Sequence, residues 1–213
     1  MRALMRLRMA ITAGLVLSLA VLAGCGNGED TAQESGANRL DTAPRGAFVG
    51  SVQGSDAYIG LISNGDEVAG YVCSNGEVSS WLAGSELDDG AAELVNRDGD
   101  ALGRVTLTTD DASGEVEVDG TSHEFAAEPA AGDAGLYRAT AGKPRKPGFV
   151  EAGWVLLGDG SQRGSANIID PDGDFVVAAA PTLDPDGQRE IISLRKEPLA
   201  AKRLSTGFVG DHR

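Results

Sequence analysis

Cysteine, positive charge and long apolar runs are all scarce in this sequence, and each scarcity excludes a class of protein. Two cysteines in 213 residues are too few for a disulfide-stabilised scaffold. The 18 Lys and Arg against 32 Asp and Glu give a formal net charge of −14, so we expect no nucleic-acid partner. One long apolar run, at the N-terminus, excludes a polytopic membrane protein. A hydrophobic content of 41% still suffices for a core, and the length suits one domain, or one domain with a small annex.

The first 25 residues have the layout of an export signal. Three arginines precede the uncharged apolar residues 9–23, which are too short for a comfortable membrane span. They lead into the tetrapeptide Leu22-Ala23-Gly24-Cys25, which resembles the lipobox of bacterial lipoproteins. The resemblance implies that signal residues 1–24 are removed and that Cys25 carries the lipid, with acyl chains such as palmitate anchoring the protein at the extracytoplasmic face of the cell membrane. The alternative is an ordinary secretory signal with a chance cysteine.

The segment after Cys25 has the composition of a flexible tether. Residues 26–45 contain one leucine and no aromatic residue. Removal of residues 1–24 takes away three arginines and no acid, which leaves a mature net charge of −17. This charge disfavours contact with anionic headgroups, so we expect the folded part to stand off from the membrane.

From residue 47 onward the sequence predicts short antiparallel strands. Turn dipeptides such as Asn64-Gly65 and Asp119-Gly120 separate the runs of apolar or alternating residues. The clearest runs are residues 48–52, 57–62, 68–73, 104–108 and 114–118.

Two stretches of this region match each other at an offset of 44 residues, 70–81 with 114–125. In each, two glycines lie six residues apart and an aromatic residue follows five residues later. This indicates a duplicated four-strand unit, with a chance match between glycine-rich meanders as the alternative. Two such units over residues 47–127 can close into an eight-stranded barrel without exposed edges. The predicted fold class is therefore all-β, a small antiparallel meander barrel with a smaller β annex.

The duplication also predicts which apolar side chains face the barrel interior. Val72 corresponds to Val116, and Trp81 corresponds to Phe125. Because both pairs are apolar in both copies, we expect all four side chains to point inward.

The neighbouring positions are predicted to face outward. Tyr71 and Cys73 correspond to Glu115 and Glu117, whose charged side chains are expected to face solvent. Cys73, the one thiol left once Cys25 is lipidated, is also expected to be a buried small hydrophobe. Both expectations hold if the annex covers the outer face of this strand. A thiol nucleophile and an intermolecular disulfide are the alternatives for Cys73.

Further strands are predicted after the barrel region. The runs are residues 136–139, 149–157, 166–169, 175–179 and 190–194. Residues 143–147 read KPRKP, an exposed break that can separate the two parts. The predicted division is a barrel-like domain at 46–142, a β annex at 143–197 and a C-terminal tail at 198–213.

Negative charge is concentrated in the barrel region. Residues 47–137 hold 18 acids against Arg97 and Arg104 alone. A solvated strand face accounts for this surplus, and a surface that collects cations or basic partners is the alternative.

Residues suited to catalysis are few. His123 and His212 are the two histidines, and no G-x-S-x-G elbow accompanies them, so we predict no catalytic residue. So little histidine and free cysteine disfavours a zinc site. Phosphate-loop and dinucleotide-binding fingerprints are absent from the sequence, so we predict no cofactor.

Asp170, Asp172 and Asp174 are the candidate for a metal site, because alternating carboxylates on a turn can converge on Ca²⁺. Phe175 and Pro181 stand where an EF-hand needs glycine and glutamate, so an ordinary Asp-Gly turn is the favoured interpretation.

Aromatic side chains provide the candidate ligand-binding residues. Tyr58, Tyr71 and Trp81 are the ones expected to contact a ligand, if the barrel holds one. Core packing is the alternative role for all three.

The body of the chain also resembles a group of proteins. The phrases AYIGLISNGDEVAGYVC at 57–73 and AAEPAAGDAGLYRA at 126–139, with the Ala, Gly and Asp bias, resemble β-rich secreted lipoproteins of actinobacteria. The resemblance implies an extracytoplasmic location and transfers no activity to individual residues.

Three functions remain open at this point. A membrane-tethered binding or interaction module of the cell envelope is favoured, with an envelope protein or a cell-wall component as its partner. An envelope hydrolase that uses a pair of carboxylates is the alternative. A purely structural envelope protein is the third.

Overall fold

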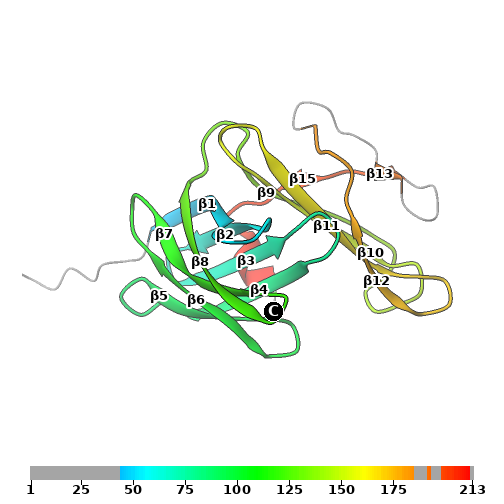
Figure 1. Ribbon diagram of the computed structural model, residues 1–213, viewed down its shortest axis with the longest axis horizontal. Helices are drawn as coiled ribbons and strands as arrows, with labels where there is room; N and C mark the ends of the chain where they lie inside the picture. The colour runs from blue at the N-terminus through cyan, green and yellow to red at the C-terminus, as the bar shows by residue number, and fades with distance from the viewer. Residues whose placement is uncertain (1–43, 185–190, 193–197, 212–213) are drawn as a thin grey trace, which may run out of the picture. The chain divides into compact units, whose positions relative to one another are not determined.

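The chain folds into a closed β-barrel and a second, open β-sheet (Figure 1). The computed structural model describes residues 44–184, 191–192 and 198–211. The barrel strands are β1 (Arg45–Val52), β2 (Tyr58–Asn64), β3 (Glu67–Cys73), β4 (Ser79–Glu86), β5 (Ala91–Val95), β6 (Ala101–Leu107), β7 (Ala112–Val118) and β8 (Thr121–Pro129). Consecutive strands pair antiparallel, and β8 pairs with β1 to close the barrel. The predicted eight-stranded meander barrel is confirmed.

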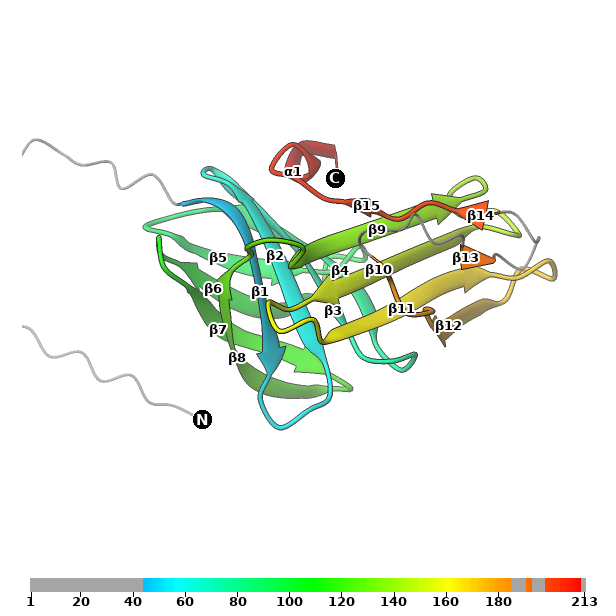
Figure 2. The ribbon, with the colours of Figure 1, turned by 90° about the horizontal axis from the view of Figure 1, so that it is seen from above.

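The second sheet has five strands in the order β12-β11-β10-β9-β15 (Figure 2). Their bounds are β9 (Gly135–Ala141), β10 (Val150–Leu156), β11 (Gln162–Ile169), β12 (Phe175–Ala179) and β15 (Lys202–Arg203). The two-residue strands β13 (Ile191–Ile192) and β14 (Pro198–Leu199) form a separate pair. The described helix is the single turn α1 (Phe208–Asp211), in agreement with the predicted all-β class.

The predicted boundary at residue 143 falls inside the second sheet. Strand β9, assigned by the sequence to the barrel-like part, pairs along its whole length with β10. The break at residues 143–147 therefore lies within the β9–β10 connection, residues 142–149. The predicted tail also contributes to the fold, because β15 pairs with β9 and Phe208 and Val209 of α1 are buried.

The two halves of the barrel differ in their outer faces. Strand β7 has the sequence ASGEVEV, and its buried and exposed residues alternate as expected for a strand with one wet face. Strand β3 has the sequence EVAGYVC, and every residue after Glu67 is buried. A strand that is buried on both faces has a continuous apolar sequence. The outer face of β3 must therefore pack against another part of the chain.

The second sheet covers this face. Tyr71, Cys73 and Trp81 on the outer face of the barrel share a buried cluster with Leu136 and Val155 of the second sheet. Gly153 of β10 packs directly against two of these aromatic rings, because a Cβ there would lie 2.5 Å from Tyr71 Cε1 and 2.9 Å from Trp81 Cζ2. The predicted outward position and burial of Tyr71 and Cys73 are confirmed.

The inward prediction is confirmed for three of the four residues and wrong for Trp81. Val72, Val116 and Phe125 belong to the cluster that fills the barrel. Trp81 pairs with the outward Tyr71 and faces the second sheet, because cross-strand partners share a face.

A difference in loop length explains the error at Trp81. The β3–β4 connection spans five residues, 74–78, whereas β7 and β8 are joined by the two-residue turn Asp119-Gly120. Both turn residues have positive φ, 49° and 74°, as a tight type I′ hairpin requires. The offset of 44 would pair Glu117 with His123, but Glu117 pairs with Ser122, and this one-residue shift turns the β8 side chains to the other face.

Several predicted features lie outside the described residues. They are the signal segment, the lipidation site Cys25, most of the tether and His212. Within the described ranges no helix is long and apolar enough to cross a membrane.

Candidate functional site

A groove of about 970 Å³ lies between the barrel and the second sheet. Strand β4 and the turns after β3, β5 and β7 contribute its barrel side, and strands β9 to β12 contribute the other side. Clefts between packed units are common places for ligands, and this volume is at the upper end of the usual range.

Glu151 is a buried carboxylate in this groove. It lies on β10 on the same face as Gly153, which points at the barrel, and its side chain has 0% exposure. Arg138 of β9 donates to Oε1 from Nε at 2.8 Å, and its Nη2 also contacts Oε1. Arg97, in the turn between β5 and β6, places Nη2 2.9 Å from both carboxylate oxygens. One buried acid thus joins a barrel turn to the second sheet.

The two arginines differ in how firmly they are held. Arg138 is 27% exposed, and its guanidinium lies 5.4 Å from the ring centre of Trp81 and 5.3 Å from that of Phe208. Such contacts between cations and aromatic faces hold a guanidinium in one orientation. Arg97 is 47% exposed and extends from a turn. Arg138 is therefore the more firmly held partner of Glu151, and the Arg97 side chain is the less restrained one.

Tyr71 and Trp81 form a buried aromatic layer beneath Arg138. Their ring centres are 4.3 Å apart. The Tyr71 hydroxyl donates to the backbone oxygen of Ser165 at 3.0 Å and lies 2.9 Å from Ser79 Oγ. Burial raises the pKa of Tyr71 well above its ordinary value, so the hydroxyl is a structural donor.

Two acceptor atoms in the groove lack a well-aligned donor. Asn167 of β11 donates from Nδ2 to the backbone oxygen of Ser79 at 3.2 Å, but its buried Oδ1 accepts no hydrogen bond within the described part of the chain. Glu151 Oε2 is buried as well and has the Arg97 contact without a hydrogen bond of good geometry. Buried polar atoms in native proteins are rarely left in this state.

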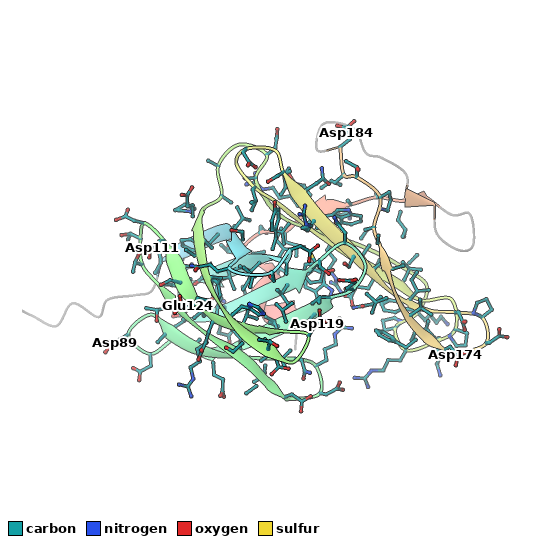
Figure 3. All side chains as sticks on the ribbon, viewed as in Figure 1. Asp89, Asp111, Asp119, Glu124, Asp174 and Asp184 are labelled. Atoms are coloured by element: carbon teal, nitrogen blue, oxygen red, sulfur yellow. The ribbon has the colours of Figure 1, made fainter. Side chains whose placement is uncertain are left out.

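The remaining lining is divided between acids and apolar side chains. Four further acids line the groove, Glu77, Asp98, Glu117 and Asp119, the last of which is labelled in Figure 3. Arg145 is the third arginine of the lining. Phe149, Ile169, Phe175 and Val177 form the apolar part. Phe175 is 65% exposed, which is unusual for so large an apolar side chain.

The aromatic residues predicted to contact a ligand are not inside the barrel. The barrel interior is filled by apolar side chains such as Phe48, Ile59 and Leu94. Trp81 lines the groove outside the barrel, and Tyr71 lies beneath it. The expectation that these rings line a ligand cavity in the barrel is corrected accordingly, since they stand on its outer face.

Tyr58 packs at the other side of the same interface. Its hydroxyl donates to Ser161 Oγ at 3.2 Å, and the Arg163 guanidinium lies 4.7 Å from the centre of its ring. These contacts give Tyr58 a packing role between barrel and sheet.

Cys73 is a buried structural residue. Its side chain is fully buried, and its Sγ contacts the backbone oxygen of Arg163 at 3.5 Å. Burial raises the pKa of the thiol to about 12. Because the thiolate is the reactive form, this environment disfavours a role as a nucleophile.

The aspartates at 170–174 form a turn. Asp170 Oδ1 accepts hydrogen bonds from the backbone nitrogens of Asp172 and Asp174, both at 2.9 Å. No group of three or more His, Cys, Asp or Glu side chains that could hold a metal ion occurs among the described residues. His123 stands apart, with Nδ1 2.9 Å from the backbone oxygen of Gln53.

The acidic surplus is displayed on the outside of the barrel. Asp89, Asp111 and Glu124 project from its strands and turns in Figure 3, and all three are exposed. These positions fit the solvated face predicted from the sequence.

The sequence did not predict the contacts of Glu151 with Arg97 and Arg138, which together form the Glu151 cluster. The available signal was one charged residue inside the apolar run FVEAGWVLL at 149–157. A charge in a buried strand needs a partner of opposite charge, although the sequence does not say which arginine provides it.

Comparisons of the chain with protein-family models, with curated proteins and with solved structures returned no match.

Proposed function

We propose that this protein is a lipid-anchored binding module of the bacterial cell envelope, and that the groove between barrel and sheet holds its ligand. The Glu151 cluster carries the proposal. It combines a buried carboxylate, two arginines from separate parts of the fold and an unpaired acceptor in one open groove. Convergent polar groups in a large, partly apolar groove are the usual features of a ligand site.

The sequence supports the anchored location. The lipobox-like residues 22–25 end a signal-like segment, and the acidic, aromatic-free residues that follow are typical of a tether. A tethered module of this kind faces the cell wall, so a cell-wall component or an envelope protein is its partner.

The contacts that Glu151 makes favour binding over catalysis. A general acid or base needs a carboxylate that exchanges a proton with a substrate. Glu151 is held by two guanidinium groups, whose contacts occupy its oxygens and stand between it and a substrate. No observation in the described part of the chain favours the carboxylate-pair hydrolase.

The test is sedimentation with isolated envelopes of the cell that makes the protein. Purified full-length protein carrying Cys25→Ser, which removes the proposed lipid anchor, is mixed with envelopes stripped of their own copy, and the bound fraction is measured after centrifugation. Ala83 lines the groove on β4, so Ala83→Trp fills the groove and should reduce the bound fraction at least tenfold. Ala126 is exposed on β8 outside the groove, so Ala126→Trp is the matched control and should bind like wild type. Equal binding by both variants contradicts the proposal.

A further inference from the structure

Two acceptors with unused hydrogen-bonding capacity define one part of the ligand. Asn167 Oδ1 is buried and accepts no hydrogen bond within the described part of the chain, and Glu151 Oε2 has the Arg97 ion-pair contact without a well-aligned hydrogen bond. A buried acceptor left unpaired is costly, so a ligand that brings O–H or N–H groups to these atoms is favoured. Arg97 is half-exposed and can turn outward to admit such a group, while Arg138 keeps the charge of Glu151 paired.

The arginines provide the complementary donors. Their contacts with Glu151 use Nε and Nη2 of Arg138 and Nη2 of Arg97. Among the described side chains, this leaves Nη1 of each guanidinium for an acceptor on the ligand. The bottom of the groove therefore presents donors and acceptors side by side, the arrangement that suits a molecule rich in hydroxyl groups.

The charge of the lining argues against anionic ligands. Five acids against three arginines repel an extended polyanion. An uncharged polar ligand does not meet this penalty.

The apolar side of the groove completes the description. Phe175 and Val177 lie on the face of β12 that lines the groove. Phe175 exposes 65% of its surface there, so a flat C–H face can pack on its ring and remove apolar area from water.

These features together fit a sugar with adjacent free hydroxyl groups, and we infer that the groove binds a neutral glycan of the cell envelope that carries vicinal diols. Ring hydroxyls pair with Asn167, Glu151 and the two arginines, and the C–H face of a sugar ring packs on Phe175. This inference rests on the proposed function and names its ligand class.

The test uses the sedimentation assay with chemically treated envelopes. Periodate cleaves vicinal diols, and a protease removes exposed protein. We expect periodate to abolish sedimentation of the full-length protein and protease treatment to leave it within twofold. Because the ligand is neutral, raising NaCl from 0.1 to 0.5 M should change the bound fraction less than twofold.

Two variants of β12 tie this result to the groove. Phe175→Ala should weaken binding at least tenfold without affecting the fold, because the side chain is mostly exposed. Val176 is 43% exposed on the opposite face of β12, so Val176→Ala is the matched control and should bind like wild type.

The outcomes separate the two proposals. Groove-dependent sedimentation that survives periodate overturns the glycan inference while the proposed function stands. Its loss after protease treatment then identifies a protein partner. Sedimentation lost at 0.5 M NaCl identifies a charged polymer and also overturns the inference. If protein with an unaltered groove never sediments in the Cys25→Ser background, the proposed function is overturned, and the glycan inference with it.

Discussion

A Gly153→Ala substitution, which adds one methyl group, tests how closely the second sheet packs on the barrel. The place of Gly153 on β10 leaves no room for a side chain, since a Cβ would lie 2.5 and 2.6 Å from two carbons of the Tyr71 ring and 2.9 Å from the Trp81 ring. Ordinary contacts between carbon atoms lie near 3.5–4.0 Å. The Gly153→Ala substitution therefore forces the sheet and the aromatic layer apart by about 1 Å.

The expected cost follows from the packing. Inserting a methyl group into a closely packed interior costs about 1–3 kcal/mol. The same displacement loosens the cover over Cys73, which is fully buried in the same cluster. We therefore expect Gly153→Ala to lower the free energy of unfolding by about 2 kcal/mol and to make Cys73 accessible to a thiol reagent.

The assay combines urea unfolding with thiol labelling of the full chain, in a Cys25→Ser background so that Cys73 is the one thiol. Gly158→Ala is the matched control, because a Cβ at Gly158 meets nothing within 4 Å and its φ is not in the left-handed region. Without strain this change should alter stability by less than about 1 kcal/mol. If Gly153→Ala is as stable as Gly158→Ala and its thiol labels no faster, the sheet does not pack on Tyr71 as described.

Further predictions concern the anchor, the ion pairs, the thiol and the secondary structure. Cys25→Ser should abolish labelling with radioactive palmitate and release the protein from the membrane fraction; a variant that still labels contradicts lipidation at this residue. Glu151→Gln leaves two arginines without their shared carboxylate and should cost about 3 kcal/mol in urea unfolding, whereas Arg97→Met should cost under about 1 kcal/mol, because Arg97 is half-exposed and Arg138 still pairs with Glu151. Burial raises the pKa of Cys73 from 9.0 to about 12, so the unfolded chain loses this proton first and stability should fall as the pH rises through that interval. The Cys73→Ala variant should show a shallower fall in the same titration, and an unchanged slope contradicts the burial. Far-ultraviolet circular dichroism should show β-structure with very little helix, and helix near one-third of the chain would be incompatible with the barrel.

The barrel could be predicted because its signals are local. Alternation in β7 and the Asp119-Gly120 turn depend on residues that are neighbours in the sequence. The covered face of β3 was also predictable, because the matching positions in β7 are the acids Glu115 and Glu117. The place of Trp81 was not, since one loop is longer than its counterpart and a one-residue shift reverses every side chain after it.

The groove could not be predicted, because its parts are far apart in the chain. Arg97 and Glu151 are 54 residues apart, and they meet only because the second sheet packs on the barrel. Glu151 could have been singled out as a charge in a buried strand. Its partners could not, because nothing in the local sequence distinguishes Arg97 or Arg138 from a solvent-exposed arginine.

The burial of the outer face of β3 under the second sheet has a consequence for folding during synthesis. Synthesis proceeds from the N-terminus, so Tyr71 and Cys73 leave the ribosome before Gly153, the residue that covers them. At 5–20 residues per second, a gap of about 80 residues lasts roughly 4–16 seconds. During that time a half-made chain carries an apolar strand without its partner, the situation in which nascent proteins aggregate. A fold whose first half depends on its last third for cover thus gains from any factor that holds the nascent chain until residue 153 has been made.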